Sequence, residues 1–156
     1  SSMGYTGHKT IKKMQGKGIF GVEMFLTLQG ELLIIEISPR THNSGHYTTE
    51  ACQTSQFVQQ LNILSGKPLG STDQKRPAVM FNLLGAEGFD GDTVVEGADQ
   101  ATNDPFVWVH LYGKKRCFPG RKMGHVTVMA ATVDEALDKV DTIRPQLNVR
   151  GAQPID

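Results

Sequence analysis

Apolar residues fall into short runs along the chain, and these runs have the length and alternation of β-strands. Five runs predict strands, at residues 18–27, 31–37, 77–85, 106–113 and 123–131. Residues 48–65 and 132–147 have apolar positions at helical spacing and predict two helices. Residues 4–17 predict a loop or a short frayed helix, and the acidic, turn-rich segment 86–105 predicts a loop or an irregular excursion. Hairpins combined with two helices predict an α+β fold with a mainly antiparallel sheet.

The ends of the two predicted helices carry recognisable signals. Gly66 and then Pro68 follow the first helical segment and predict its end. Thr132 and Glu135 have the spacing of a capping box, which predicts the start of the second helix.

Composition narrows the class of protein. The chain has 156 residues, 38% hydrophobic and 21% charged, as in an ordinary globular protein of one domain or two small ones. Lys and Arg total 16, as do Asp and Glu, so the net charge gives no indication of nucleic-acid binding. No apolar run is long enough to cross a membrane, and no secretory segment is visible. Cys52 and Cys117 form no CxxC pair, which favours reduced thiols over a disulfide. The opening Ser1-Ser2-Met3 is interpreted as a cloning remnant before an initiating Met.

Two glutamates are predicted to face each other across the first hairpin. If Gln29 and Gly30 form a two-residue loop, Glu23 lies directly opposite Glu36. The same face would carry three apolar side chains, Phe25, Leu32 and Ile34. Facing like charges are unfavourable unless one carboxyl keeps its proton or a cation lies between them, and two carboxylates suit Mg²⁺. The alternative is a one-residue shift or a bulge that sends one glutamate to solvent.

A dense polar segment, EISPRTHNSGHY at residues 36–47, follows the second strand. The planar fork of Arg40 suits a phosphate or a carboxylate, and His42 and Asn43 can orient a polar ring or a carbonyl. The alternative is a solvated loop in which Asn43, Ser44 and Gly45 are turn formers. That alternative explains Arg40, His42 and His46 less well.

A second cluster is basic and consists of Lys114, Lys115, Arg116, Arg121 and Lys122. Pro119 and Gly120 mark a turn within it. The cluster could hold a phosphorylated ligand or nucleic acid, and the zero net charge with few interleaved aromatics favours the former. A solvated basic hairpin is the alternative.

Five segments in order, GIFGVEMF, EISPRTHNSGHYTTEACQTSQF, RPAVMFNLLG, HLYGK and PGRKMGHVTV, resemble a known family. They are similar to the C-terminal half of N5-carboxyaminoimidazole ribonucleotide synthetase, the ATPase subunit of phosphoribosylaminoimidazole carboxylase. The resemblance covers residues 18–150. It implies the C-terminal part of an ATP-grasp domain over residues 18–70 and a small β-rich domain over 71–156, after a cloning remnant and a loop or short helix over 1–17.

The resemblance implies an ATP-grasp ligase of purine biosynthesis with ATP and Mg²⁺ as cofactors. Such an enzyme activates bicarbonate as carboxyphosphate and carboxylates the amino group of 5-aminoimidazole ribonucleotide. The resemblance also implies a cytoplasmic protein, a homodimer for the full-length enzyme, and no nucleic-acid or membrane partner.

By resemblance, Glu23 and Glu36 bind the metal, Arg40, His42 and Asn43 contact the ribonucleotide, and Lys114, Arg121 and Lys122 hold this substrate. Lys114 and Arg121 are also the implied catalytic residues. Two departures from the family pattern are Ile35, where an Asn is frequent, and Phe118, where a basic residue is usual.

The chain carries no GxGxxG motif before the first strand. We therefore expect a fragment of the synthetase that does not hydrolyse ATP in response to 5-aminoimidazole ribonucleotide. Alternatives are a non-catalytic ribonucleotide-binding or assembly module, a relative of the ATP-grasp phosphoribosylglycinamide formyltransferase, and a nucleic-acid binder that uses residues 114–122.

Overall fold

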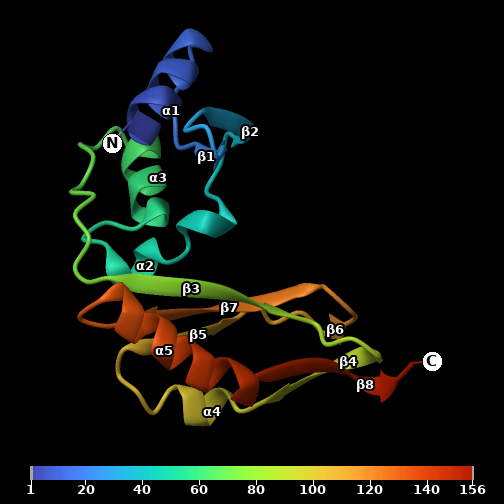
Figure 1. Ribbon diagram of the computed structural model, residues 1–156. Helices are drawn as coiled ribbons and strands as arrows, with labels where there is room; N and C mark the ends of the chain where they lie inside the picture. The colour runs from blue at the N-terminus through green and yellow to red at the C-terminus, as the bar shows by residue number, and fades with distance from the viewer. Residues whose placement is uncertain (1, 156) are drawn as a thin grey trace. The chain divides into compact units, whose positions relative to one another are not determined.

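The computed structural model describes residues 2–155 and divides into two compact units, Ser1–Asp73 and Gln74–Asp156. The first unit contains a helix, a hairpin and three short helical segments (Figure 1). These elements are α1 (Ser2–Lys13), β1 (Gly21–Leu26), β2 (Leu32–Ser38), the 3₁₀ turn η1 (Asn43–Gly45), α2 (Thr48–Ala51) and α3 (Gln56–Leu64). No helix in the part of the chain that the structure describes is long and apolar enough to cross a membrane.

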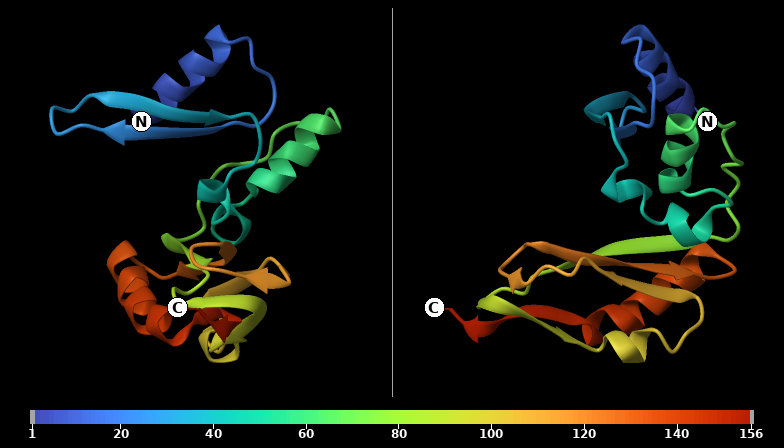
Figure 2. Two further views of the ribbon diagram at one scale, coloured as in Figure 1. Left: turned by 90° about the vertical axis from the view of Figure 1, so that its right-hand side faces the viewer. Right: turned by 180° about the vertical axis from the view of Figure 1, so that it is seen from behind.

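The β1–β2 hairpin contains a bulge that changes the predicted register. Figure 2 shows the two strands extended side by side. Leu26 pairs with Leu32 at the turn end, so the loop is one residue longer than expected, and Gly30 adopts the positive φ of 84° that its tight turn requires. The register shifts between Glu23 and Met24, and Glu23 then pairs with Glu36 as predicted. The extra residue on β2 is Ile35.

The bulge corrects the predicted surroundings of the glutamates. Because Met24 pairs with Ile34, the side chains of Leu32 and Ile34 lie on the face opposite to Glu23 and Glu36. Phe25 remains on the glutamate side and is 65% exposed. The pair therefore lies on an open surface rather than on a mostly buried apolar face.

The predicted helix over 48–65 is two helices. Ser55 has extended backbone angles and its hydroxyl accepts from the Val58 N–H, so it caps α3 at a new start. The N–H of Gln53 donates to the carbonyl of Asp73, which fixes the connecting segment outside the helix. Gly66, with φ of 65°, follows the end of α3 as predicted.

The second unit contains two three-stranded antiparallel sheets, with the strand orders β3-β7-β5 and β6-β4-β8. Its elements are β3 (Ala78–Leu84), β4 (Phe89–Glu96), α4 (Ala98–Ala101), β5 (Val107–Leu111), β6 (Arg116–Cys117), β7 (Lys122–Met129), α5 (Val133–Ile143), the 3₁₀ turn η2 (Arg144–Gln146) and β8 (Asn148–Pro154). The α+β class with mainly antiparallel strands is confirmed.

The second unit has a core of branched aliphatic side chains. Val126 and Val128 on β7 are fully buried, and Leu83, Val107 and Val140 pack in the same cluster. Helix α5 covers this core and begins as predicted, with the Thr132 hydroxyl accepting from the N–H of Glu135. The sequence pattern thus identified the helix that closes the core.

The acidic segment 86–105 was wrongly predicted to be irregular, since it contains β4 and α4. Two of the three acidic residues of β4 pair with arginines on the neighbouring strands. Asp90 pairs with Arg116 on β6 at 2.7 Å, and Glu96 pairs with Arg150 on β8 at 3.0 Å. These pairs make an acidic strand compatible with a sheet.

Candidate functional site

The paired glutamates and His42 form the first candidate site. Glu23 and Glu36 lie opposite each other in the hairpin. The imidazole of His42 lies between them, with Nδ1 3.4 Å from Glu23 Oε1 and Nε2 3.5 Å from Glu36 Oε1. The carboxylate side chains are 43% and 51% exposed, whereas that of His42 is only 13% exposed. The site is therefore a partly buried imidazole between two accessible carboxylates.

Glu36 is held in its charged form. The hydroxyl of Ser38 donates to Glu36 Oε1 and is the largest cause of a pKa below the ordinary value of 4.5. Burial acts in the opposite direction, and the charges of His42 and Arg40 lower the pKa further. An ionised carboxylate at the strand end is available as an oxygen ligand at neutral pH.

A small cavity adjoins His42 in the same unit. It has a volume of about 280 Å³, and the residues that line it include Gly21, Arg40, His42, Tyr47 and Gln56. Gly21 lets the imidazole approach, because a Cβ at Gly21 would lie 2.6 Å from the Cβ of His42. Burial is the main cause that raises the pKa of Tyr47, which therefore stays a neutral phenol.

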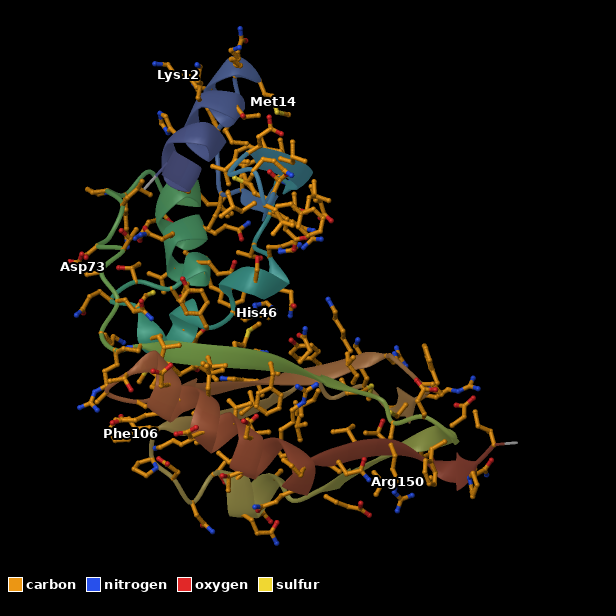
Figure 3. All side chains as sticks on the ribbon, viewed as in Figure 1. Lys12, Met14, His46, Asp73, Phe106 and Arg150 are labelled. Atoms are coloured by element: carbon orange, nitrogen blue, oxygen red, sulfur yellow. The ribbon has the colours of Figure 1, made fainter. Side chains whose placement is uncertain are left out.

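Of the remaining predicted residues of the polar segment, Arg40 lines this cavity, whereas Asn43 and His46 do not. The exposed guanidinium of Arg40 donates to the carbonyl of Thr41 at 3.0 Å. Asn43 begins η1, and His46, labelled in Figure 3, stacks on Phe57 at 5.6 Å between ring centroids. The segment is thus an ordered turn that presents polar groups, rather than an unstructured loop.

Sequence reasoning missed Gln56 at this site. Its side chain contacts the backbone of His42 through two hydrogen bonds of 2.9 Å. No motif indicated it, because Gln56 lies fourteen residues beyond His42 within an ordinary helical pattern.

The second candidate site is the basic segment between β5 and β7. Lys114 Nζ donates to the carbonyl of Lys122 and lies 5.7 Å from the centroid of the Tyr112 ring. Arg121 Nη1 donates to the carbonyl of Arg116 at 2.7 Å, and its guanidinium lies 5.1 Å from the centroid of Phe118. Aromatic rings support both cations. Phe118, a departure from the family pattern, is therefore a support for Arg121.

The charges of this segment divide into two groups. Arg116 donates to both carboxylate oxygens of Asp90, at 2.8 and 2.7 Å, and lowers the pKa of that carboxyl. Among the ion pairs in residues 2–155, none uses Lys114, Arg121 or Lys122. These three cations are therefore available to an external anion.

Backbone contacts hold the tip of the basic segment in place. The N–H of Gly85 donates to the carbonyl of Arg121 at 2.8 Å, and the N–H of Gly120 donates to the carbonyl of Gly85 at 2.9 Å. A Cβ at Gly85 would lie 2.1 Å from the carbonyl oxygen of Phe118, so only glycine fits without movement. The position of Arg121 therefore depends on Gly85, the residue that directly follows β3.

Within each unit the structure brings some of the eight predicted site residues together. Glu23, Glu36 and His42 converge in the first unit, and Lys114 contacts Lys122 in the second. The predicted pocket would combine residues from both units, and it stays a prediction.

The two carboxylates fit a divalent cation that keeps most of its water. No cluster of three or more His, Cys, Asp or Glu suited to a metal occurs in the described part of the chain. Glu23 and Glu36 would thus supply two oxygen ligands, and water and phosphate oxygens would complete the shell, as is usual for Mg²⁺.

Comparison with known proteins assigns each unit. Residues 5–57 match the model of the ATP-grasp domain, and residues 78–139 match the phosphoribosylaminoimidazole carboxylase C-terminal domain. The fold and the matched residues thus define part of an ATP-grasp protein. Over both matched domains the chain is similar to N5-carboxyaminoimidazole ribonucleotide synthases.

Three similar proteins show the extent of the match. The synthase of Bacillus subtilis (strain 168) is 45% identical over 79% of this chain and 31% of its own length. The synthetase structure from Thermotoga maritima is 49% identical with a TM-score of 0.86, over 91% of this chain and 39% of that one. The synthase of Aspergillus clavatus, solved with ADP and 5-aminoimidazole ribonucleotide, is 37% identical with a TM-score of 0.72, over 83% of this chain and 34% of that one. The chain thus spans about a third of the length of its relatives.

Proposed function

We propose that the chain forms part of the active site of an ATP-dependent ligase of purine biosynthesis. The ligase carboxylates 5-aminoimidazole ribonucleotide with bicarbonate, through carboxyphosphate. The observation that carries this proposal is the facing pair of Glu23 and Glu36 with His42 between them. The similarity to N5-carboxyaminoimidazole ribonucleotide synthases supports it, as does the relative from Aspergillus clavatus that was solved with ADP and the ribonucleotide.

Glu23 and Glu36 are proposed to hold Mg²⁺ together with the phosphates of ATP. When bound, the metal neutralises charge on the phosphoryl group that is transferred. The chain contributes the geometry: the bulge at Ile35 returns the two glutamates to opposite positions, and Ser38 keeps Glu36 ionised. Both features prepare the carboxylates before any ligand arrives.

The ribonucleotide is proposed to contact both polar segments. Arg40, His42 and Asn43 offer donors and acceptors for its ring and ribose. Lys114, Arg121 and Lys122 are proposed to hold its phosphate, which is supported by the lack of ion pairs at these cations within residues 2–155. Lys114 and Arg121 are the proposed catalytic residues.

Positioning is the main contribution of these residues to the reaction. Carboxyphosphate is short-lived in water, so the acceptor amine must be held close and water must be kept away. A phosphate anchored at Arg121 would fix the far end of the ribonucleotide and leave only the amino group to be oriented. Bicarbonate and a homodimer of the full-length enzyme belong to the same proposal.

Calorimetric titration of the chain with 5-aminoimidazole ribonucleotide tests the phosphate assignment. The Arg121→Ala variant is expected to bind roughly 10- to 100-fold more weakly, because a hydrogen bond to a charged group contributes about 1.5–3 kcal/mol. Lys115→Ala is the matched control, since Lys115 is an exposed cation of the same segment without an assigned role. Equal weakening in both variants would indicate non-specific attraction and would reject the assignment. An absence of binding with an intact circular dichroism spectrum would reject a ribonucleotide pocket in this chain.

A further inference from the structure

The side chain of Gln56 is a buried carboxamide at the start of α3, and it is engaged on the loop that carries His42. Gln56 is only 9% exposed. Its Oε1 accepts from the N–H of His42 at 2.9 Å, and its Nε2 donates to the carbonyl of His42 at 2.9 Å. One side chain thereby satisfies both backbone groups of His42, which restricts the residue to rotation about its side-chain torsions.

The same carboxamide also contacts the far end of the loop. Gln56 Nε2 lies 2.9 Å from Nδ1 of His46. An amide nitrogen only donates, so His46 presents Nδ1 as an acceptor. Gln56 therefore spans the loop from its first histidine to its second.

The loop is shaped around this side chain. A Cβ at Gly45 would lie 2.5 Å from Gln56 Oε1 and 2.9 Å from its Cδ. Thr48 completes the arrangement, because its hydroxyl donates to the carbonyl of Gly45 at 2.6 Å and accepts from the N–H of Gln56 at 3.0 Å. The absence of a side chain at Gly45 is thus matched to the space that the carboxamide fills.

We propose that Gln56 is a positioning residue that fixes the backbone of His42 so that its imidazole lies between Glu23 and Glu36. From that fixed backbone the ring packs against Gly21, and its Nε2 lies 3.5 Å from Glu36 Oε1. Its Nδ1 lies 2.9 Å from the hydroxyl of Ser44 and 3.4 Å from Glu23 Oε1. The importance of this role for ligand binding rests on the proposed function, whereas the role itself is a property of the free chain. The two can therefore be tested separately.

The chain offers a matched control on the same helix. Gln59 is also 9% exposed, and its carboxamide holds the backbone of Gly70 by the same pair of bonds. Gln59 Nε2 donates to the carbonyl of Gly70 at 2.8 Å, and the N–H of Gly70 donates to Gln59 Oε1 at 3.0 Å. Substitution at Gln59 therefore removes an equivalent clamp from α3 without touching the loop of His42.

The test is a proton NMR measurement of the contact between the His42 side chain and the Hα atoms of Gly21, in the chain without ligand. Gln56→Glu has the same shape but turns an acceptor toward the carbonyl of His42 and toward His46. We expect the His42–Gly21 cross-peaks to be present in the original chain and in Gln59→Glu, and to be lost in Gln56→Glu.

A second variant separates positioning from folding. Gly45→Ala keeps the glutamine at position 56, but its new Cβ displaces the carboxamide of Gln56. We expect this variant to remove the same cross-peaks. Persistence of the contact in a folded Gln56→Glu or Gly45→Ala chain would overturn the proposal. Equal loss in Gln59→Glu, or unfolding of both site variants while Gln59→Glu folds, would assign Gln56 a purely structural role and would also overturn it. This measurement does not involve ribonucleotide binding. A failure to bind the ribonucleotide would therefore count against the proposed function alone.

Discussion

Gly85→Ala is expected to move the loop that carries Arg121 while leaving the chain folded. The new Cβ would lie 2.1 Å from the carbonyl oxygen of Phe118 and 2.8 Å from Cys117 Sγ. Real Cβ atoms keep at least 3.0 Å from such neighbours, so the carbonyl has to move by about 0.9 Å or more. The obstacle is backbone rather than a flexible side chain, so the segment around Phe118 must shift as a unit.

This shift has a cost in stability and in local order. Overpacking of a close backbone contact costs roughly 1–3 kcal/mol. The displacement also disturbs the two backbone hydrogen bonds that join Gly85 to Gly120 and Arg121, of 2.9 and 2.8 Å. Loss of about 1.4 kcal/mol of local protection corresponds to about tenfold faster amide exchange. Ribonucleotide affinity should fall as well, since the guanidinium of Arg121 moves with its backbone.

Hydrogen exchange at the Gly120 amide, measured alongside denaturant unfolding, checks this expectation. Gly88→Ala is the control: Gly88 has a φ of 77° but open space around its missing Cβ. That variant should lose about 1–2 kcal/mol through left-handed backbone strain without faster exchange at Gly120. Exchange at Gly120 that is unchanged in Gly85→Ala, or equally raised in Gly88→Ala, would refute the steric reasoning.

Three further predictions concern single contacts. Thr132→Ala should lower the free energy of unfolding by about 1 kcal/mol through loss of the α5 cap, and an unchanged denaturant midpoint would contradict this. Lys139→Met should destabilise the chain at neutral pH, because the hydrogen bond from Lys139 is the largest cause that lowers the pKa of Asp104 below 3.8. A lowered pKa gives stability that is present above the unfolded value and lost as pH falls through the folded one, so thermal melts of variant and parent should converge as the pH is lowered past the ordinary value of 3.8. Ser38→Ala should raise the pKa of Glu36 toward 4.5, and an NMR titration of the carboxyl carbon that shows no rise would count against the assigned cause.

Local patterns were sufficient to predict most elements and the central pair of the first site. The cap at Thr132 depends on neighbours close in sequence, so spacing predicted it, whereas the opposition of Glu23 and Glu36 was predicted from an ideal two-residue loop that the hairpin does not have. The spacing of residues did not predict the bulge at Ile35. Two register changes, a longer loop and the bulge, cancelled at the glutamates, so the pairing was right although the faces assigned to Leu32 and Ile34 were wrong.

Other features depend on partners distant in sequence. The sequence of β4 looks irregular because it is acidic. The residues that compensate Asp90 and Glu96, Arg116 and Arg150, lie on strands that pair with β4 only in the folded unit. The clamp of Gln56 on His42 joins residues fourteen positions apart and leaves no periodic signal. Propensity and spacing carry local information, whereas cross-strand compensation and buried polar contacts require the tertiary structure.

The two cysteines, one in each compact unit, are natural probes of local opening. Cys52 is 6% exposed and Cys117 is fully buried, and neither forms a disulfide. Burial is the main cause that raises the pKa of the Cys117 thiol, which slows its reaction with alkylating reagents while the unit is closed. Alkylation of each thiol therefore reports the opening of the structure around it. The two labelled peptides, separated by mass spectrometry, would give the two opening rates in a single sample and without any engineered probe.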